Sequence, residues 1–91
     1  MENEKLMTIG EAIEAVKKGK KVSRKCWNGK GQYIELATNV SYVSASTGEI
    51  VNVDHKSMGN CAIAFVGTSG VQLGWLASQA DLLSEDWFIV D

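Results

Sequence analysis

The sequence predicts an α+β fold in which an N-terminal amphipathic helix packs on an antiparallel β-sheet. Three observations lead to this class. The chain has 91 residues, the size of one domain, so residues 1–91 are expected to form a single domain. One segment near the N-terminus has the apolar spacing of a helix. Most of the remainder consists of short strand-like runs separated by Gly, Asn, Ser and Asp turns, and the chain contains no proline.

The helix is predicted to begin at Thr8. Thr8-Ile9-Gly10-Glu11 has the T-x-x-E form of a capping box, in which each side chain accepts a hydrogen bond from the other residue's backbone. The apolar residues that follow form one stripe, made of Ile9, Ala12, Ile13 and Val16. Lys17 and Lys18 occupy the last turn, and Gly19 is the position of a left-handed C-cap. We expect no chemistry in the interior of this helix.

The strands are predicted from apolar, β-branched and aromatic runs between turn residues. They cover residues 20–27, 32–37, 39–45, 49–53, 62–66, 71–75 and 88–90. Asn28-Gly29-Lys30-Gly31 joins the first two strands, because Asn-Gly between such runs is a strong hairpin signal. Residues 46–48 and 67–70 connect two further hairpins, and the polar stretch 54–60 is predicted to be a loop.

A short helical turn is predicted before the last strand. Ser78-Gln79-Ala80-Asp81 has the form of a helix start, in which Asp81 completes a capping pair with Ser78. The two leucines that follow provide one turn of apolar contact. Trp87 opens the last strand, and we expect its ring in the core.

Charge is distributed unevenly along the chain, whose formal net charge is -2. Residues 1–30 contain eight of the nine basic residues and four acids, a balance of +4, whereas residues 31–91 contain one base and seven acids, a balance of -6. The isoelectric point near 5.3 argues against binding to a nucleic-acid polymer, but a local basic segment can hold a small anion. The alternative is that the lysines complement a helix dipole and maintain solubility.

Aromatic residues are numerous for so small a protein. The chain has three Trp, two Tyr and two Phe. At this length only about 60 to 65% of the unfolded surface can be buried, so a monomer would be marginally stable. Either the core is unusually aromatic, or some rings lie at subunit or ligand contacts.

The sequence also predicts a cytosolic protein with reduced thiols. No apolar run approaches the ~20 residues of a membrane span, and the first five residues lack the basic-then-apolar order of a secretory signal. Cys26 and Cys61 stand 35 positions apart without a CxxC motif, which favours free thiols over a disulfide or a redox pair.

Catalytic and metal-binding motifs are nearly absent. His55 is the only histidine, and a metal site made with Cys26 and Cys61 has spacings that match no zinc signature. Gly29-Lys30-Gly31 lacks the upstream Gly and the following Ser or Thr of a phosphate-binding P-loop. Three acids could act as acid and base, although capping and solvated roles account for them: Asp81, Glu85 and Asp86. We therefore expect no catalytic residue, no metal and no cofactor.

One segment, residues 24–31, has the composition of a nucleotide-binding site. Arg24, Lys25 and Lys30 surround Trp27 beside a Gly-rich turn. Stacking of a planar base on an aromatic ring contributes roughly 1–3 kcal/mol in nucleic-acid binders. Arg and backbone N–H groups hold phosphate oxygens through charge-assisted hydrogen bonds. The alternative is that Trp27 belongs to the core and the turn has no further role.

A second segment, residues 74–87, leads from a strand into a helix start. Trp75 ends the strand, and Ser78 and Gln79 stand at the N-terminus of the predicted helical turn. Free N–H groups at a helix N-terminus attract anions. Capping alone explains Asp81 without any ligand.

Together these segments resemble a family of small phage and prophage proteins that includes the second type of Thoeris anti-defence protein. The first motif is Arg24-x-x-Trp27-Asn28-Gly29-Lys30-Gly31-x-Tyr33-Ile34. The second is Trp75-Leu76-Ala77-Ser78-Gln79-x-Asp81-x-Leu83-x-x-Asp86-Trp87. The helix over residues 8–19 matches the usual opening of the family. The resemblance covers the chain except for roughly residues 38–60, where family members vary.

The resemblance implies that the protein is a sponge for an immune signal. Thoeris is a bacterial defence in which a TIR-domain enzyme converts NAD into a cyclic ADP-ribose isomer, which activates a killing effector. Proteins of this type bind that signal, glycocyclic ADP-ribose, without degrading it. They form homotetramers with the ligand between subunits, and some also hold cyclic dinucleotides at separate sites. The implied location is the cytoplasm of the infected bacterium, with neither a nucleic-acid polymer nor a membrane as partner.

The expected site combines both segments. Trp27 is expected to stack the base or to close one pocket wall, while neighbouring polar and basic side chains face phosphate and ribose oxygens. The second segment lines the pocket from the other side. The expected ligand contacts are Arg24, Trp27, Asn28, Lys30, Trp75, Ser78 and Asp81. Two other classes stay open: an enzyme that hydrolyses a cyclic nucleotide or ADP-ribose signal through Asp81, Asp86 or His55, and a module that binds the defence enzyme or effector directly.

Overall fold

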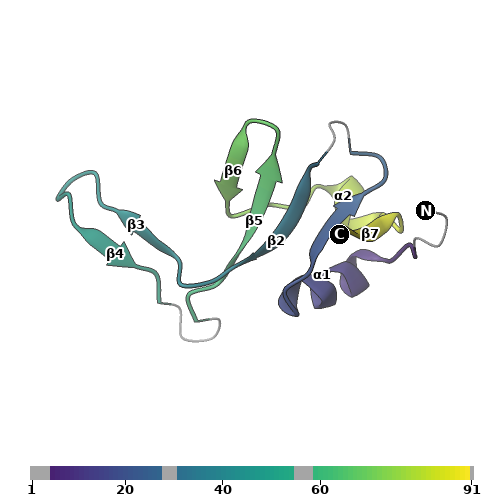
Figure 1. The fold of residues 1–91 in the computed structure, drawn as a ribbon, viewed down its shortest axis with the longest axis horizontal. Helices are drawn as coiled ribbons and strands as arrows, with labels where there is room; N and C mark the ends of the chain where they lie inside the picture. Colours follow the sequence, from purple (N-terminus) through teal and green to yellow (C-terminus); the bar gives the residue numbers. More distant parts are fainter. Residues whose placement is uncertain (1–4, 28–30, 55–58, 91) are drawn as a thin grey trace.

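The computed structural model describes residues 5–27, 31–54 and 59–90. Figure 1 shows a sheet with one helix on its face, a second short helix near the C-terminus and a separate two-stranded arm. The elements in chain order are α1 (Ile9–Lys17), β1 (Lys21–Arg24), β2 (Tyr33–Ala37), β3 (Ser41–Val43), β4 (Ile50–Asn52), β5 (Ala62–Gly67), β6 (Gly70–Leu73), α2 (Gln79–Leu83) and β7 (Trp87–Val90). The predicted α+β class is confirmed.

The main sheet has five antiparallel strands in the order β6-β5-β2-β1-β7. Val22 of β1 lies opposite Ile34 of β2 on one side and opposite Ile89 of β7 on the other. The last strand of the chain therefore pairs with the first strand. Met7 also pairs with Trp87, so the segment before α1 is attached to the start of β7. This pairing places the two motifs of the sequence at the same end of the sheet.

Helix α1 packs on one face of the sheet and forms the core with it. Among the residues that the structure describes, the apolar side chains with 0 or 1% exposure are Ala12, Val16, Val22, Ile34 and Trp87. Complete burial of each larger apolar side chain contributes about 1.5–3 kcal/mol. The core position predicted for Trp87 is confirmed.

The ends of α1 follow local sequence rules. Thr8 and Glu11 form the predicted capping box, and Gly19 has a φ of +90°, the left-handed conformation expected after the helix. The helical turn before the last strand is also confirmed as α2, where Ser78 and Asp81 form a second capping box. Both helices therefore begin where the sequence predicts.

Strands β1 and β6 end earlier than predicted because the chain turns there. Strand β1 ends at Arg24 and not at Trp27, since the Trp27 N–H donates to the Arg24 carbonyl across a turn, at 3.2 Å. Strand β6 ends at Leu73, and Gly74 follows with a φ of +88°. Glycine adopts that conformation without the steric cost that other residues have. Trp27 and Trp75 thus leave the sheet and turn toward each other.

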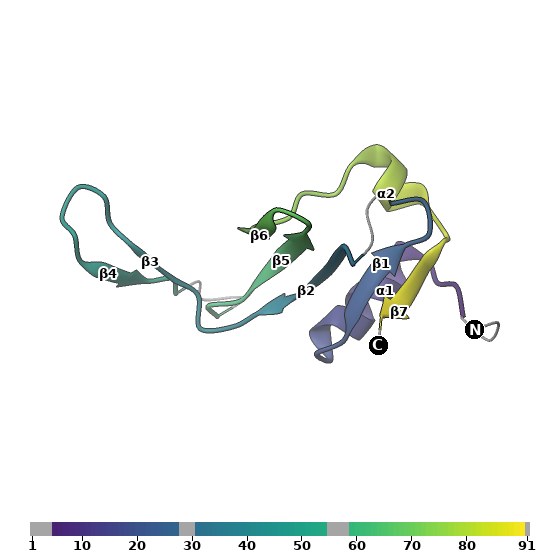
Figure 2. The ribbon, with the colours of Figure 1, turned by 45° about the horizontal axis from the view of Figure 1, so that its top comes forward.

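The β3–β4 hairpin forms an arm that extends away from the main sheet (Figure 2). It lengthens the molecule to 50 Å, against 29 and 25 Å in the other directions. The radius of gyration is 14.8 Å, whereas a compact chain of this size has about 12 Å. Tyr42, Val43 and Ile50 on this arm are 56 to 72% exposed. An isolated two-stranded hairpin is marginally stable in water, so this arm has apolar surface available for contact with another molecule.

Two further findings concern membranes and metals. In the described part of the chain, no helix is long and apolar enough to cross a membrane. Within the same ranges, no group of three His, Cys, Asp or Glu side chains is arranged to hold a metal ion. His55 lies outside the described residues.

Candidate functional site

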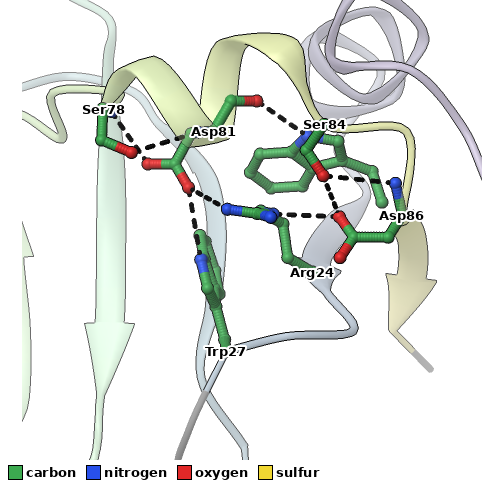
Figure 3. Close-up of polar contacts among 7 residues, drawn as sticks. Arg24, Trp27, Ser78, Asp81, Ser84 and Asp86 are labelled. Atoms are coloured by element: carbon green, nitrogen blue, oxygen red, sulfur yellow. Dashed lines mark hydrogen bonds and ion pairs between the residues drawn. The ribbon is translucent and has the colours of Figure 1, made fainter.

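The candidate site lies where β1, α2 and β7 meet at one end of the sheet. Its centre is an ion-pair cluster of Arg24, Asp81 and Asp86 (Figure 3). The Arg24 Nη1 donates to Asp81 Oδ1 at 2.8 Å, and the Arg24 Nε donates to Asp86 Oδ1 at 2.9 Å. The exposed fractions of these side chains are 11%, 10% and 27%. Charge-assisted hydrogen bonds in such partly dry surroundings are stronger than neutral ones.

Asp81 connects this cluster to two other groups. Its Oδ2 accepts from the Ser78 N–H at 2.9 Å, and its own N–H donates to the Ser78 hydroxyl at 3.1 Å, which completes the cap of α2. Its Oδ1 also accepts from the indole Nε1–H of Trp27 at 3.4 Å, a long hydrogen bond. One carboxylate therefore caps a helix, pairs with Arg24 and contacts Trp27.

Both carboxylates of the cluster are held ionised. Burial raises the pKa of Asp81, but hydrogen bonds from Ser78, Arg24 and Trp27 outweigh it and keep that pKa below its ordinary value. Burial also opposes ionisation of Asp86, and there the hydrogen bonds from Arg24 and the Ser84 hydroxyl bring the net pKa below normal. The Asp86 carboxylate in turn raises the pKa of Arg24. All three groups are charged at neutral pH.

Four aromatic rings pack beside the ion-pair cluster. The ring centroid of Trp27 lies 5.5 Å from that of Phe65, 6.3 Å from that of Trp75 and 5.2 Å from that of Trp87, each in an edge-to-face arrangement. Trp75 and Trp87 also contact each other, at 5.9 Å. Such pairs contribute about 0.5–1.5 kcal/mol beyond area burial. Much of the aromatic surplus in the sequence is therefore used in one cluster that borders the core.

A cavity of about 350 Å³ opens beside this cluster. Its lining residues are Ser23, Arg24, Lys25, Trp27, Gly31, Gln32, Phe88 and Val90. The Lys25 Nζ lies over the Phe88 ring, 5.0 Å from its centroid, so a cation and an aromatic face are side by side. The volume is at the lower end of the range of about 300–1,000 Å³ for small-molecule pockets. The lining suits a ligand that combines an anionic part with a planar part.

A second cavity, of about 480 Å³, lies between α1 and the β2–β5 part of the sheet. Its lining is mainly apolar and consists of Ile13, Val16, Lys17, Leu36, Cys61, Ala62 and Ile63. None of the ligand contacts predicted from the sequence lines it. Cys61 is half-buried there as a free thiol, and Cys26 is an exposed free thiol elsewhere.

The structure brings together five of the seven residues predicted from the sequence. Arg24, Trp27 and Asp81 are in direct contact, Ser78 caps the helix that carries Asp81, and Trp75 packs against Trp27. The other two predicted contacts, Asn28 and Lys30, lie outside the described residues. Whether any of the seven contacts a ligand stays a prediction. Arg24 also pairs with two carboxylates, Asp81 and Asp86, which the sequence did not predict.

Several cavity residues were missed in the sequence analysis. Phe88 and Ser23 lie opposite each other on neighbouring strands, and both line the cavity. The sequence did not show that β7 pairs with β1, and this pairing brings residues 23–25 next to residue 88. Lys25 follows the last residue of β1 and lies over the Phe88 ring, whereas Arg24 pairs with two carboxylates.

Comparisons with known proteins show which family the chain belongs to. The family model described as Tad2-like, Thoeris anti-defense 2-like domain, matches residues 7–90. A protein named Thoeris anti-defense 2 from Bacillus phage SP01 is 38% identical over 88 residues, covering 92% of this chain and 94% of that protein. The chain belongs to the Tad2-like family. Membership places it among phage anti-defence proteins directed against Thoeris.

Within this Tad2-like protein, the match extends through both motifs and includes the β3–β4 arm. The ion-pair cluster, the aromatic cluster and the 350 Å³ cavity all lie within the matched residues. The family resemblance inferred from the two motifs is therefore confirmed.

Proposed function

We propose that this Tad2-like protein sequesters the Thoeris signal, glycocyclic ADP-ribose, without degrading it. The observation that carries the proposal is the cavity beside Trp27, in a chain that belongs to an anti-Thoeris family. An adenine offers a planar ring to Phe88 or Trp27, and a pyrophosphate offers negative charge to Lys25. These contacts match the two chemical parts of a cyclic ADP-ribose.

The state of the carboxylates favours binding over hydrolysis. A general acid at neutral pH needs a raised pKa, so that it still holds a proton to donate. The pKa values of Asp81 and Asp86 are instead lowered, and both groups are engaged with Arg24. These two acids, which the enzymatic alternative names beside His55, therefore lack the protonation state of an acid catalyst.

The proposal includes assembly into a homotetramer with pockets completed by neighbouring subunits. The cavity in one chain is small for a ligand made of an adenosine, a pyrophosphate and a second ribose, and tight ligand sites bury about 70–90% of the ligand surface. The exposed apolar residues of the arm and of β6 provide surface for such contacts, among them Tyr42, Val43, Ile50, Val71 and Leu73.

Titration calorimetry of the purified chain with glycocyclic ADP-ribose tests the proposal. We expect saturable binding, with linear ADP-ribose as the comparison ligand and cyclic dinucleotides as probes for a separate site. At a ligand concentration of 100 times Kd, binding to the folded state adds about 2.7 kcal/mol to the free energy of unfolding, which raises the melting temperature. An unchanged melt and no heat would contradict the proposal and favour a protein partner.

A further inference from the structure

The ion-pair cluster engages two of the five N–H donors of Arg24 with carboxylates. Its side chain is 11% exposed and donates through Nη1 to Asp81 and through Nε to Asp86. Breaking either pair leaves a poorly hydrated charge without its partner, which is costly in a low-dielectric environment. Arg24 therefore remains bound to the two carboxylates when a phosphate comes near.

The net charge of the cluster also argues for a structural role of Arg24. One guanidinium and two ionised carboxylates carry a net charge of -1, so the cluster as a whole does not attract a pyrophosphate. Arg24 and Lys25 both line the cavity, and Lys25, over the Phe88 ring, is the one outside the cluster. The positive charge that attracts an anionic ligand thus comes from Lys25, which is not one of the residues that hold the site together.

Trp27 connects the cluster to the cavity. Its indole lines the cavity and is contacted at Nε1 by Asp81. Edge-to-face contacts with Phe65, Trp75 and Trp87 limit where the ring lies, and the single polar edge of the indole fixes its rotation. A small rotation of this ring would change the shape of the cavity wall.

We propose that Arg24, Asp81 and Asp86 form a positioning clamp, in which Asp81 orients the Trp27 indole at the cavity wall and Arg24 holds Asp81 in place. This inference rests on the proposed function, because it assigns roles within that site. It adds a role to the sequence prediction, in which Arg24 faces the phosphate. Asp86 enters the site as the second anchor of Arg24.

The Asp81→Asn substitution distinguishes a role of Asp81 in positioning Trp27 from a direct effect of its charge on the ligand. Asn keeps the size of the side chain but has one acceptor oxygen, so it cannot serve Ser78, Arg24 and Trp27 together. If charge alone mattered, removal of a negative group near an anionic ligand would tighten binding. The clamp predicts the opposite sign, since a reoriented Trp27 weakens binding by about tenfold or more.

The experiment measures two properties of wild type, Asp81→Asn and Asp86→Asn. The first is the affinity for glycocyclic ADP-ribose, corrected for the folded fraction and taken at two salt concentrations. The second is the chemical shift of the Trp27 indole N–H in the ligand-free protein, assigned with Trp27→Phe. Thr8→Ala is the control, because it removes the capping hydroxyl of the other helix, α1, and lies outside the site.

We expect weaker binding in Asp81→Asn with an unchanged salt dependence, a smaller loss in Asp86→Asn, and a shifted Trp27 indole signal in Asp81→Asn. Thr8→Ala should bind as wild type does. Equal or tighter binding by Asp81→Asn, or an unmoved indole signal, would overturn the clamp. If wild type itself retains no signal, the proposed function fails, and the indole shift alone then decides whether Asp81 orients Trp27.

Discussion

Arg24 joins parts of the chain that are far apart in sequence. Its partners Asp81 and Asp86 are 57 and 62 residues away. No local pattern marks such a pair, because the contact depends on β7 lying beside β1. The sequence therefore predicts Arg24 as a candidate site residue from its neighbours Trp27 and Asn28, but it does not predict the two carboxylates that pair with it.

Acid should destabilise the protein through this cluster. The folded-state pKa values of Asp81 and Asp86 are below normal, so the unfolded chain takes up protons first as the pH falls. Their contribution is complete above about pH 4 and is lost as the pH falls through the lower folded-state values. Urea unfolding between about pH 7 and about pH 3 measures the loss. The double variant Asp81→Asn and Asp86→Asn should show a flatter profile, and an equally steep one would contradict this assignment.

Lys25 is expected to contribute charge to ligand binding. Its ammonium group lies 5.0 Å from the centroid of the Phe88 ring at the cavity. We expect Lys25→Gln to weaken binding of the cyclic ADP-ribose by about tenfold and to reduce the dependence of affinity on salt, because one screened charge interaction is removed. Calorimetry at two ionic strengths measures both effects. Lys18→Gln at the exposed end of α1 is the control, and equal losses in both variants would rule out a specific role for Lys25.

At the level of secondary structure, the helices were the most predictable elements. Thr8 and Glu11 lie within one turn, so the signal for the start of α1 is contained in four residues. The strand ends were harder, since β1 ends at Arg24 where a turn begins and β6 ends before Gly74. The order of the strands could not be predicted, because pairing of β7 with β1 depends on contacts between distant segments.

The capping box of α1 should be measurable by itself. We expect Thr8→Ala to lower the free energy of unfolding by about 1 kcal/mol, because the Glu11 N–H loses the hydroxyl that accepts it at 3.3 Å. Urea unfolding gives the value. Thr68→Ala in the exposed β5–β6 turn serves as the comparison, and its effect should stay within about 0.5 kcal/mol. Similar losses in free energy of unfolding for both variants would show that the Thr8 cap stabilises the protein no more than an exposed turn residue does.

At the scale of the whole molecule, the β3–β4 arm accounts for the elongated shape of the chain. Val43 and Ile50 face each other across the β3–β4 pair and are 65 and 72% exposed. Apolar pairs of this kind gain from burial against another surface. The sequence predicted the hairpin but not its separation from the main sheet. Nothing in residues 38–60 shows which surface the hairpin packs against.

The proposed homotetramer makes a prediction about mass. Light scattering on a sizing column should give four times the chain mass of 9.9 kDa. We expect Ile50→Ser to reduce the assembled fraction, because it removes an apolar side chain that is 72% exposed in one chain. Thr47→Ser, in the turn of the same arm, is the control. A mass of one chain for wild type would contradict the assembly.

The central claim is that the protein holds the Thoeris signal and leaves it unchanged. A release assay tests this most directly. The protein is incubated with the signal made by the TIR enzyme, unbound small molecules are filtered away, the protein is denatured, and the released material is separated by chromatography. We predict recovery of intact glycocyclic ADP-ribose in near-stoichiometric yield. Recovery of a converted product, or of nothing, would contradict sequestration.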